Sequence, residues 1–125
     1  MRLLLDTHVY LWFLADSPKL SKAARLRISN ADMVYVSAAS IWEASIKIGI
    51  GTLSANIDDL VAGIEASGFV ELPVLARHAA RVNSLPAHHR DPFDRLLIAQ
   101  AINEPLRLLT ADELLTRYTD LVEVV

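Results

Sequence analysis

Five short apolar runs, separated by longer amphipathic segments, place the strongest limit on what this chain can fold into. The first run is three leucines at residues 3–5, and Asp6 ends it. Short, predominantly apolar runs are typical of strands buried on both faces, as in a parallel sheet. By this criterion, strands are predicted at residues 3–5, 33–36, 69–72, 106–109 and 121–125.

Segments with helical periodicity lie between these predicted strands. The clearest helix start is Asp91-Pro92, because aspartate is a favourable N-cap and proline suits the first helical position. Gly49 and Gly51 mark the end of an earlier helix. Helices are predicted at residues 7–15, 20–28, 37–48, 58–66, 75–85, 91–102 and 111–115. Because strands and helices alternate, the prediction is an α/β fold whose parallel sheet is covered on both faces.

Length and composition narrow the class of protein further. The 125 residues correspond to one domain, predicted to span residues 1–125. The absence of cysteine excludes disulfides and thiolate metal sites, and it fits a reducing compartment such as the cytoplasm. The apolar fraction of 53% excludes a disordered chain, and no uncharged apolar run reaches the roughly 18 residues that a membrane span needs. So high an apolar fraction also predicts an exposed apolar patch and therefore a protein partner.

Acidic side chains follow the predicted strands, at the edge of the sheet where ligands bind in such folds. Asp6 ends the first strand, and Glu43 lies in the helix after the second. Asp94 lies in the first turn of the helix that Asp91 opens, and Asp112 follows the fourth strand. Carboxylates gathered in this way repel one another unless a cation is bound, and Mg²⁺ or Mn²⁺ prefers oxygen ligands. We therefore predict a Mg²⁺ or Mn²⁺ site, at which metal-activated water can attack a phosphodiester.

Several of these residues also have a purely structural interpretation. Glu43 follows Ser40 by three positions, which is a capping-box spacing, and precedes Lys47 by four, which favours an ion pair within a helix. Thr110 with Glu113 is another capping-box match. The two interpretations are compatible, because helix N-termini lie at the same edge of the sheet as the strand ends.

The four histidines predict no catalytic arrangement. His88 and His89 are adjacent in a polar stretch, so a solvated loop is expected, while His8 and His78 are expected at surface or partly buried polar positions. No Ser-His-Asp arrangement can be argued from the spacing. A glycine-rich phosphate loop is also absent, which argues against a nucleotide cofactor.

Four motifs occur in a fixed order along nearly the whole chain. They are Leu-Asp-Thr-His at residues 5–8, Ser-Ile-Trp-Glu-Ala-Ser-Ile-Lys at 40–47, His-Arg-Asp-Pro-Phe-Asp-Arg-Leu-Leu-Ile-Ala-Gln-Ala at 89–101, and Thr-Ala-Asp-Glu at 110–113. In this order they resemble the PIN-domain ribonucleases of the VapC toxin type. The segment 91–101 is the most specific part of the resemblance.

The resemblance implies a PIN-like α/β/α sandwich with a short, mainly parallel sheet of about five strands, and it implies metal-dependent cleavage of RNA. Asp6, Glu43 and Asp94 match the three acids of the family's core site, and Asp112 matches a fourth, more variable one. Asp6 and Asp94 are expected to bind the metal directly, and Glu43 and Asp112 directly or through water. The implied partners are an RNA substrate, a cognate antitoxin encoded by the adjacent gene, and a second copy of the chain in a homodimer.

The same match assigns supporting roles to the residues around the acids. Thr7 and Thr110 match small hydroxyl residues near the metal, and Ser40 is placed with them in the outer shell. Asp91 is interpreted as a helix cap first and an outer-shell helper second. Ala111 is a departure, because relatives of this type often carry arginine there; the difference affects substrate contact and leaves the metal ligands intact.

Lys47, Arg90 and Arg95 lie close in sequence to the acids and are candidates to hold flanking phosphates of the RNA, although solvated surface positions explain them equally well. The net charge of −3 does not exclude an RNA substrate, because without the four proposed ligands it becomes +1. A bound metal would offset these same charges.

Three other kinds of protein share part of this pattern. A phosphoryl-accepting receiver domain requires a lysine late in the chain, whereas the lysines here are Lys19, Lys22 and Lys47. A haloacid-dehalogenase-like phosphatase requires a second aspartate two residues after Asp6, where this chain has His8. A catalytically weak PIN scaffold that only binds a protein is the remaining alternative, and the presence of all four acids argues against it.

Overall fold

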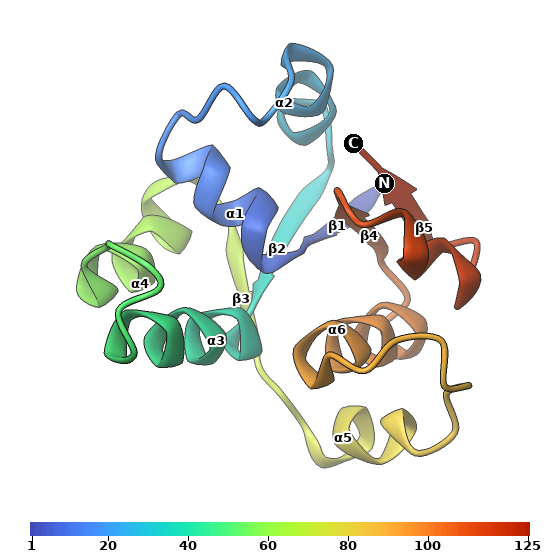
Figure 1. Cartoon of the computed structure of the whole chain (residues 1–125). Helices are drawn as coiled ribbons and strands as arrows, with labels where there is room; N and C mark the ends of the chain where they lie inside the picture. The colour runs from blue at the N-terminus through green and yellow to red at the C-terminus, as the bar shows by residue number, and fades with distance from the viewer.

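Strand β1 (Arg2–Leu5) is the central strand of a five-stranded parallel sheet, as its unbroken run of leucines predicts (Figure 1). The computed structural model describes all residues from 1 to 125. Leu4 of β1 is paired with Tyr35 on one side and with Leu108 on the other. The other strands are β2 (Met33–Ser37), β3 (Val70–Leu72), β4 (Arg107–Thr110) and β5 (Val122–Val124), and the order across the sheet is β3-β2-β1-β4-β5.

Helices cover both faces of the sheet, so the predicted α/β/α architecture is confirmed (Figure 1). Helices α1 (Thr7–Leu14), α2 (Lys22–Ser29) and α4 (Ile57–Ala66) pack on the face that receives Leu3 and Leu5. Helix α6 (Pro92–Asn103) packs on the opposite face, against Leu4, and α5 (Ala76–Val82) packs against α6. Helix α3 (Ala38–Gly49) contacts α1, α4 and α6, which places it beside the carboxyl edge of the sheet.

Helix α1 is held at a fixed angle by close packing against α4. The Tyr10 hydroxyl donates to the Leu60 carbonyl over 2.7 Å. A Cβ atom on Gly63 would lie 2.9 Å from Leu14 Cδ1 and 3.0 Å from the Tyr10 hydroxyl, so a larger residue at this crossing would require these side chains to shift. Helix α1 begins directly after Asp6, the first acidic residue of the predicted site.

Some predicted boundaries are wrong, and local hydrogen bonds explain why. Helix α2 begins at Lys22 instead of residue 20, because the Ser21 hydroxyl accepts from the Ala24 amide and caps it. The helix predicted at residues 111–115 is a 3₁₀ helix, η1 (Glu113–Arg117), which the Asp112 carboxylate caps. Helix α5 is shorter than the predicted 75–85. None of the helices combines the length and the apolar character that a membrane crossing requires.

Candidate active site

Asp6 occupies the centre of the carboxyl edge, between the end of β1 and the start of α1. It is the N-cap of α1, because one carboxylate oxygen, Oδ1, accepts from the Val9 amide over 2.8 Å. The other oxygen, Oδ2, accepts from the Thr110 hydroxyl over 2.5 Å. The Asp6 side chain is almost fully buried. Both oxygens are thus oriented by the protein while each keeps a free lone pair for a cation.

Glu43 reaches the same edge from α3 and is also buried. The Lys47 ammonium lies 2.8 Å from its Oε2, so the ion pair expected within the helix is confirmed. The capping box expected between Ser40 and Glu43 is wrong, because the N-cap of α3 is Ser37. The Ser40 hydroxyl accepts instead from the Thr7 hydroxyl over 3.0 Å, and this buried contact joins α3 to α1 beside Asp6.

Asp94 lies in the first turn of α6, where the predicted cap is confirmed. The Asp91 carboxylate accepts from the amides of Phe93 and Asp94 over 2.9 and 3.3 Å, and Pro92 occupies the first helical position. Asp91 therefore shapes the helix start, while the Asp94 side chain remains free to face the other acids.

Asp112 joins the site from the turn after β4. The Thr110 hydroxyl accepts from the Asp112 amide over 3.1 Å while it donates to Asp6, so one hydroxyl links two acidic residues. The capping box expected between Thr110 and Glu113 is therefore wrong. Asp112 caps η1 through Oδ1, and its Oδ2 lies 3.2 Å from Nε2 of His89.

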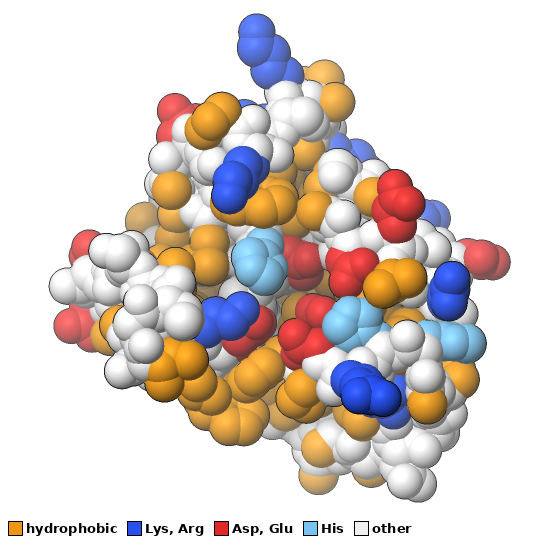
Figure 2. All heavy atoms as spheres, viewed as in Figure 1, with side chains coloured by type: hydrophobic (Ala, Val, Ile, Leu, Met, Phe, Trp, Pro, Cys, Tyr) orange, Lys and Arg blue, Asp and Glu red, His pale blue; other side chains and the backbone are white.

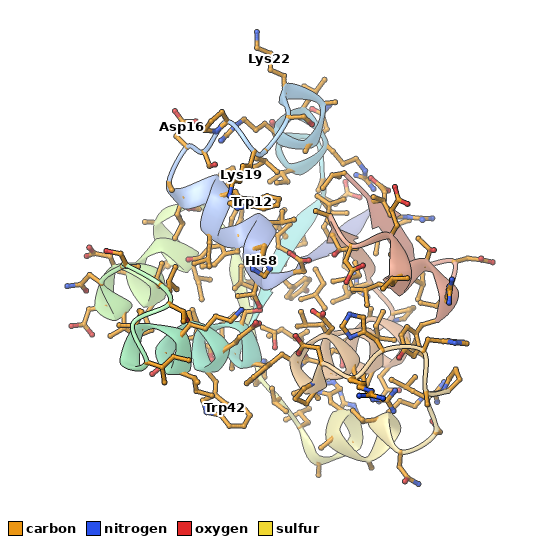
Figure 3. The ribbon with its side chains drawn as sticks, viewed as in Figure 1. His8, Trp12, Asp16, Lys19, Lys22 and Trp42 are labelled. Carbon is orange, nitrogen blue, oxygen red and sulfur yellow. The ribbon has the colours of Figure 1, made fainter.

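An open pocket of about 530 Å³ lies at this edge, and Glu43 is not among the residues that line it. Asp6, Asp94 and Asp112 contribute carboxylates to its wall, and His8 and Trp12 from α1 form its rim. Figure 2 shows the acidic side chains gathered in a hollow at the centre of this face, with histidine side chains beside them. In Figure 3, His8 and Trp12 lie on the side of α1 that faces the viewer, above this hollow. The four predicted acids thus meet at one edge of the sheet.

The electrostatics of the pocket fit a divalent cation. Burial is the main cause that raises the pKa of Asp6 above its usual range, while the hydrogen bonds from Thr110 and Val9 oppose the shift. Burial, followed by the charges of Asp91 and Asp6, raises the pKa of Asp94 to about 7. Carboxylates whose pKa values are raised in this way lack a compensating positive charge nearby. A hard cation that prefers oxygen ligands supplies that charge. The donor set therefore fits Mg²⁺ or Mn²⁺.

The three basic residues that were candidates for RNA contacts have different surroundings in the structure. The Arg95 guanidinium donates to the Pro86 and Val82 carbonyls and to the Tyr118 hydroxyl, so it holds a loop together. Lys47 is paired with Glu43. Arg90 is exposed and makes no side-chain hydrogen bond within the protein.

Sequence reasoning misjudged two histidines. His89 belongs to the site: its ring nitrogen, one oxygen of Asp94 and one of Asp112 all lie within 4.8 Å of one another. Its position in the motif at residues 89–101 was the available signal. His78, expected at the surface or partly buried, is completely buried, and its Nε2 lies 2.6 Å from Glu104.

An α/β/α fold with acids converging at the carboxyl edge of a parallel sheet is the arrangement that the resemblance to PIN-domain proteins predicts. The PIN domain family model matches residues 3–121, and the chain belongs to this family. It is 35% identical over 116 residues to Ribonuclease VapC22 of Mycobacterium tuberculosis, and the alignment covers 87% of this chain and 85% of that protein.

Solved structures with much lower sequence identity share the same fold. One is the structure of VapBC2 from Rickettsia felis bound to a DNA fragment from their promoter, with a TM-score of 0.73, 16% identity and coverage of 99% of this chain and 98% of that one. Another is DNA-bound VapBC from Salmonella typhimurium, with a TM-score of 0.70, 16% identity and coverage of 100% and 97%.

Proposed function

We propose that this protein is a metal-dependent endoribonuclease and the toxin of a type II toxin–antitoxin pair. The observation that carries the proposal is the convergence of Asp6, Glu43, Asp94 and Asp112 at one edge of the sheet, inside or beside one open pocket. Membership of the PIN family and the likeness to Ribonuclease VapC22 support RNA as the substrate.

Asp6 and Asp94 would hold Mg²⁺ or Mn²⁺ directly, and Glu43 and Asp112 directly or through water. When bound, the cation supplies Lewis acidity that activates water and offsets charge on the phosphate. The protein's own groups keep the acids in place: the Val9 amide and the Thr110 hydroxyl orient Asp6. Arg90, which is exposed beside the pocket residues His89 and Asp91, is the best placed of the basic residues to contact the RNA backbone.

A groove beside the acidic pocket offers a surface for the antitoxin. It has a volume of about 560 Å³ and runs between α1 and the segment that leads into α4, with Leu11, Leu53 and Leu60 among its walls. His8 and Trp12 line both this groove and the acidic pocket. A partner that covers the groove with apolar side chains would therefore also close one side of the pocket.

An exposed apolar stripe on α3 supports the proposed homodimer. Trp42, Ile46 and Ile50 follow one another at intervals of four residues and are 60%, 40% and 69% exposed. Trp42 packs edge-on against Phe93 of α6, with ring centroids 5.0 Å apart, and points outward from α3 (Figure 3). Replacing Trp42 and Ile46 together with serine should shift the sedimentation coefficient from that of a dimer to that of a monomer. An unchanged coefficient would place the dimer contact elsewhere.

The nuclease proposal is tested by assaying RNA cleavage with Mg²⁺ for the parent, Asp6→Asn and Asp94→Asn, and for the parent with a chelator. Cleavage should fall on the order of 100- to 1,000-fold in both variants and disappear with the chelator. Asp120→Asn is the matched control, because Asp120 is exposed and lies outside the pocket. If cleavage survives both substitutions and chelation, the metal mechanism is wrong.

The toxin proposal requires a separate experiment in cells. Induced expression of the chain alone should arrest growth, and co-expression of the adjacent upstream gene should restore it. Asp6→Asn should be harmless in both conditions. Growth that is unaffected by the intact chain would contradict the toxin role while leaving the nuclease activity to be judged by the cleavage assay.

A further inference from the structure

His89 presents a ring nitrogen to two acidic residues of the site. Its Nε2 lies 3.2 Å from Oδ2 of Asp112 and 3.7 Å from Oδ2 of Asp94. By distance alone, these three side chains form a compact set of metal ligands. The hydrogen bonding of the opposite ring nitrogen decides whether His89 can act as one of them.

The backbone amide of Asp91 donates to Nδ1 of His89 over 3.0 Å. An amide can only donate, so Nδ1 is the acceptor and carries no proton. The neutral ring then carries its proton on Nε2, and an Nε2–H group donates a hydrogen bond and does not coordinate a metal. The nitrogen that faces the acids is therefore a donor to carboxylates.

Hydrogen bonds that involve Tyr118 and Arg95 hold the segment that carries His89 in place. The His89 amide donates to the Tyr118 hydroxyl over 2.8 Å, and the same hydroxyl accepts from Arg95 over 3.1 Å. The Arg95 guanidinium also binds the Pro86 carbonyl over 2.9 Å, at the start of this loop. His89 is thus held through its backbone and through both ring nitrogens, whereas the His88 ring packs edge-on against Tyr118, 5.2 Å away.

We propose that His89 is a positioning residue of the active site and not a metal ligand: its Nε2–H holds Oδ2 of Asp112 at the pocket. The Leu114 amide holds Oδ1 of the same carboxylate over 3.0 Å. The Asp112 side chain is 37% exposed, so without His89 it is free to turn toward solvent. Of the four acids, it is the one whose place depends on this histidine. This inference rests on the proposed function, because it assigns Asp112 to the metal site.

The tautomer can be measured without any metal. Long-range ¹H–¹⁵N NMR of the metal-free protein at alkaline pH should show the His89 proton on Nε2. A proton on Nδ1 would overturn the proposal. The measurement is independent of nuclease activity, so it decides the role of His89 even if the proposed function is wrong.

The second measurement uses Mn²⁺ as the probe. Pulsed electron paramagnetic resonance of the Mn²⁺-loaded protein should show no directly coordinated ¹⁴N, and a coordinated nitrogen would overturn the proposal. His89→Ala should weaken Mn²⁺ binding about 10-fold by calorimetry, as the loss of a hydrogen-bond partner of a metal ligand commonly does. His89→Gln should restore most of the loss, because its amide can donate to Asp112.

The coupling between His89 and Asp112 is the sharpest test. In an Asp112→Asn background, His89→Ala should leave Mn²⁺ affinity unchanged, because the carboxylate that it positions is gone. An equal loss in both backgrounds would overturn the proposal. His88→Ala is the matched control and should bind Mn²⁺ like the parent, since its ring packs against Tyr118 and makes no hydrogen bond to the acids. A parent protein that binds no Mn²⁺ would instead contradict the proposed function.

Discussion

The inner half of the site, Asp6 and Glu43, differs from the outer half, Asp94 and Asp112, in how the acids are held. The inner acids are 5% and 4% exposed, and their partners are the Thr110 hydroxyl and the Lys47 ammonium. The outer side chains are 21% and 37% exposed. Asp94 is surrounded mainly by other acids, and Asp112 is held by the His89 ring and one amide.

The difference shows how a small domain can place four like charges together. The inner acids are fixed by hydrogen bonds to Asp6 and by the ion pair of Glu43 with Lys47, so their geometry exists before any ligand arrives. The outer acids are less compensated, and burial with neighbouring charges raises the pKa of Asp94 to about 7. Burial also raises the pKa of Asp6, so the charge state of one acid in each half depends on what binds.

The largest expected effect separates the two halves by activity. Asp6→Asn should reduce RNA cleavage on the order of 100- to 1,000-fold, whereas Asp112→Asn should reduce it on the order of 10- to 100-fold. Asparagine keeps the N-cap of α1, so circular dichroism should show both variants folded. Equal losses in single-turnover cleavage would remove the distinction between the halves.

The next effect concerns the stability of the metal-free protein. The pKa of Asp94 is raised above its unfolded value, so its contribution to stability is fully present at low pH and is lost as the pH rises through about 7. Asp94→Asn should therefore match the parent near pH 4 and exceed its free energy of unfolding by about 1–2 kcal/mol at pH 8. Urea unfolding with a chelator measures this. A variant that is less stable than the parent at pH 8 would contradict it.

A smaller effect is expected at the hydroxyl that joins the halves. Thr110→Val keeps the side-chain shape but removes the donor to Asp6 and the acceptor of the Asp112 amide. Mn²⁺ affinity should fall about 10-fold by calorimetry. Thr116→Val, on the exposed surface of η1, is the matched control. If Thr110→Val binds Mn²⁺ like the control, the hydroxyl does not orient the acids.

The smallest effect is expected at Lys47. Lys47→Gln removes the charge that compensates Glu43, and because the Lys47 side chain is 36% exposed, the metal-free protein should lose only about 0.5 kcal/mol of stability. Thermal unfolding with and without Mg²⁺ measures the difference. The loss should shrink with the metal, because the cation takes over the role of Lys47. A loss unaffected by Mg²⁺ would separate Glu43 from the metal site.

The sheet and the meeting of the acids could be predicted because both follow from chain order and periodicity. Parallel strands bring their carboxyl ends to one edge, so the residues after β1 and β4 had to meet there. The capping boxes at Ser40 and Thr110 could not be judged from local spacing. Their hydroxyls bond to Thr7 and Asp6, which are 33 and 104 positions away.

The histidines were misjudged for the same reason. The motif at residues 89–101 includes His89 and not His88, but spacing alone does not show what either ring contacts. Their rings differ because Asp91 and Asp112 hold one and Tyr118 packs against the other. His78 is buried because Glu104, from the end of α6, pairs with it. Partners that are distant in sequence decide the roles of these side chains, and a single sequence does not display them.

The pairing of β1 with β4 determines when the site can form during synthesis of the chain. Asp6 is synthesised long before its hydroxyl partner Thr110, which lies 104 positions later in the chain. A nascent chain therefore cannot assemble the four acids until β4 has entered the sheet beside β1. For the proposed ribonuclease, the site is therefore incomplete for as long as the chain between Asp6 and Asp112 is still being made.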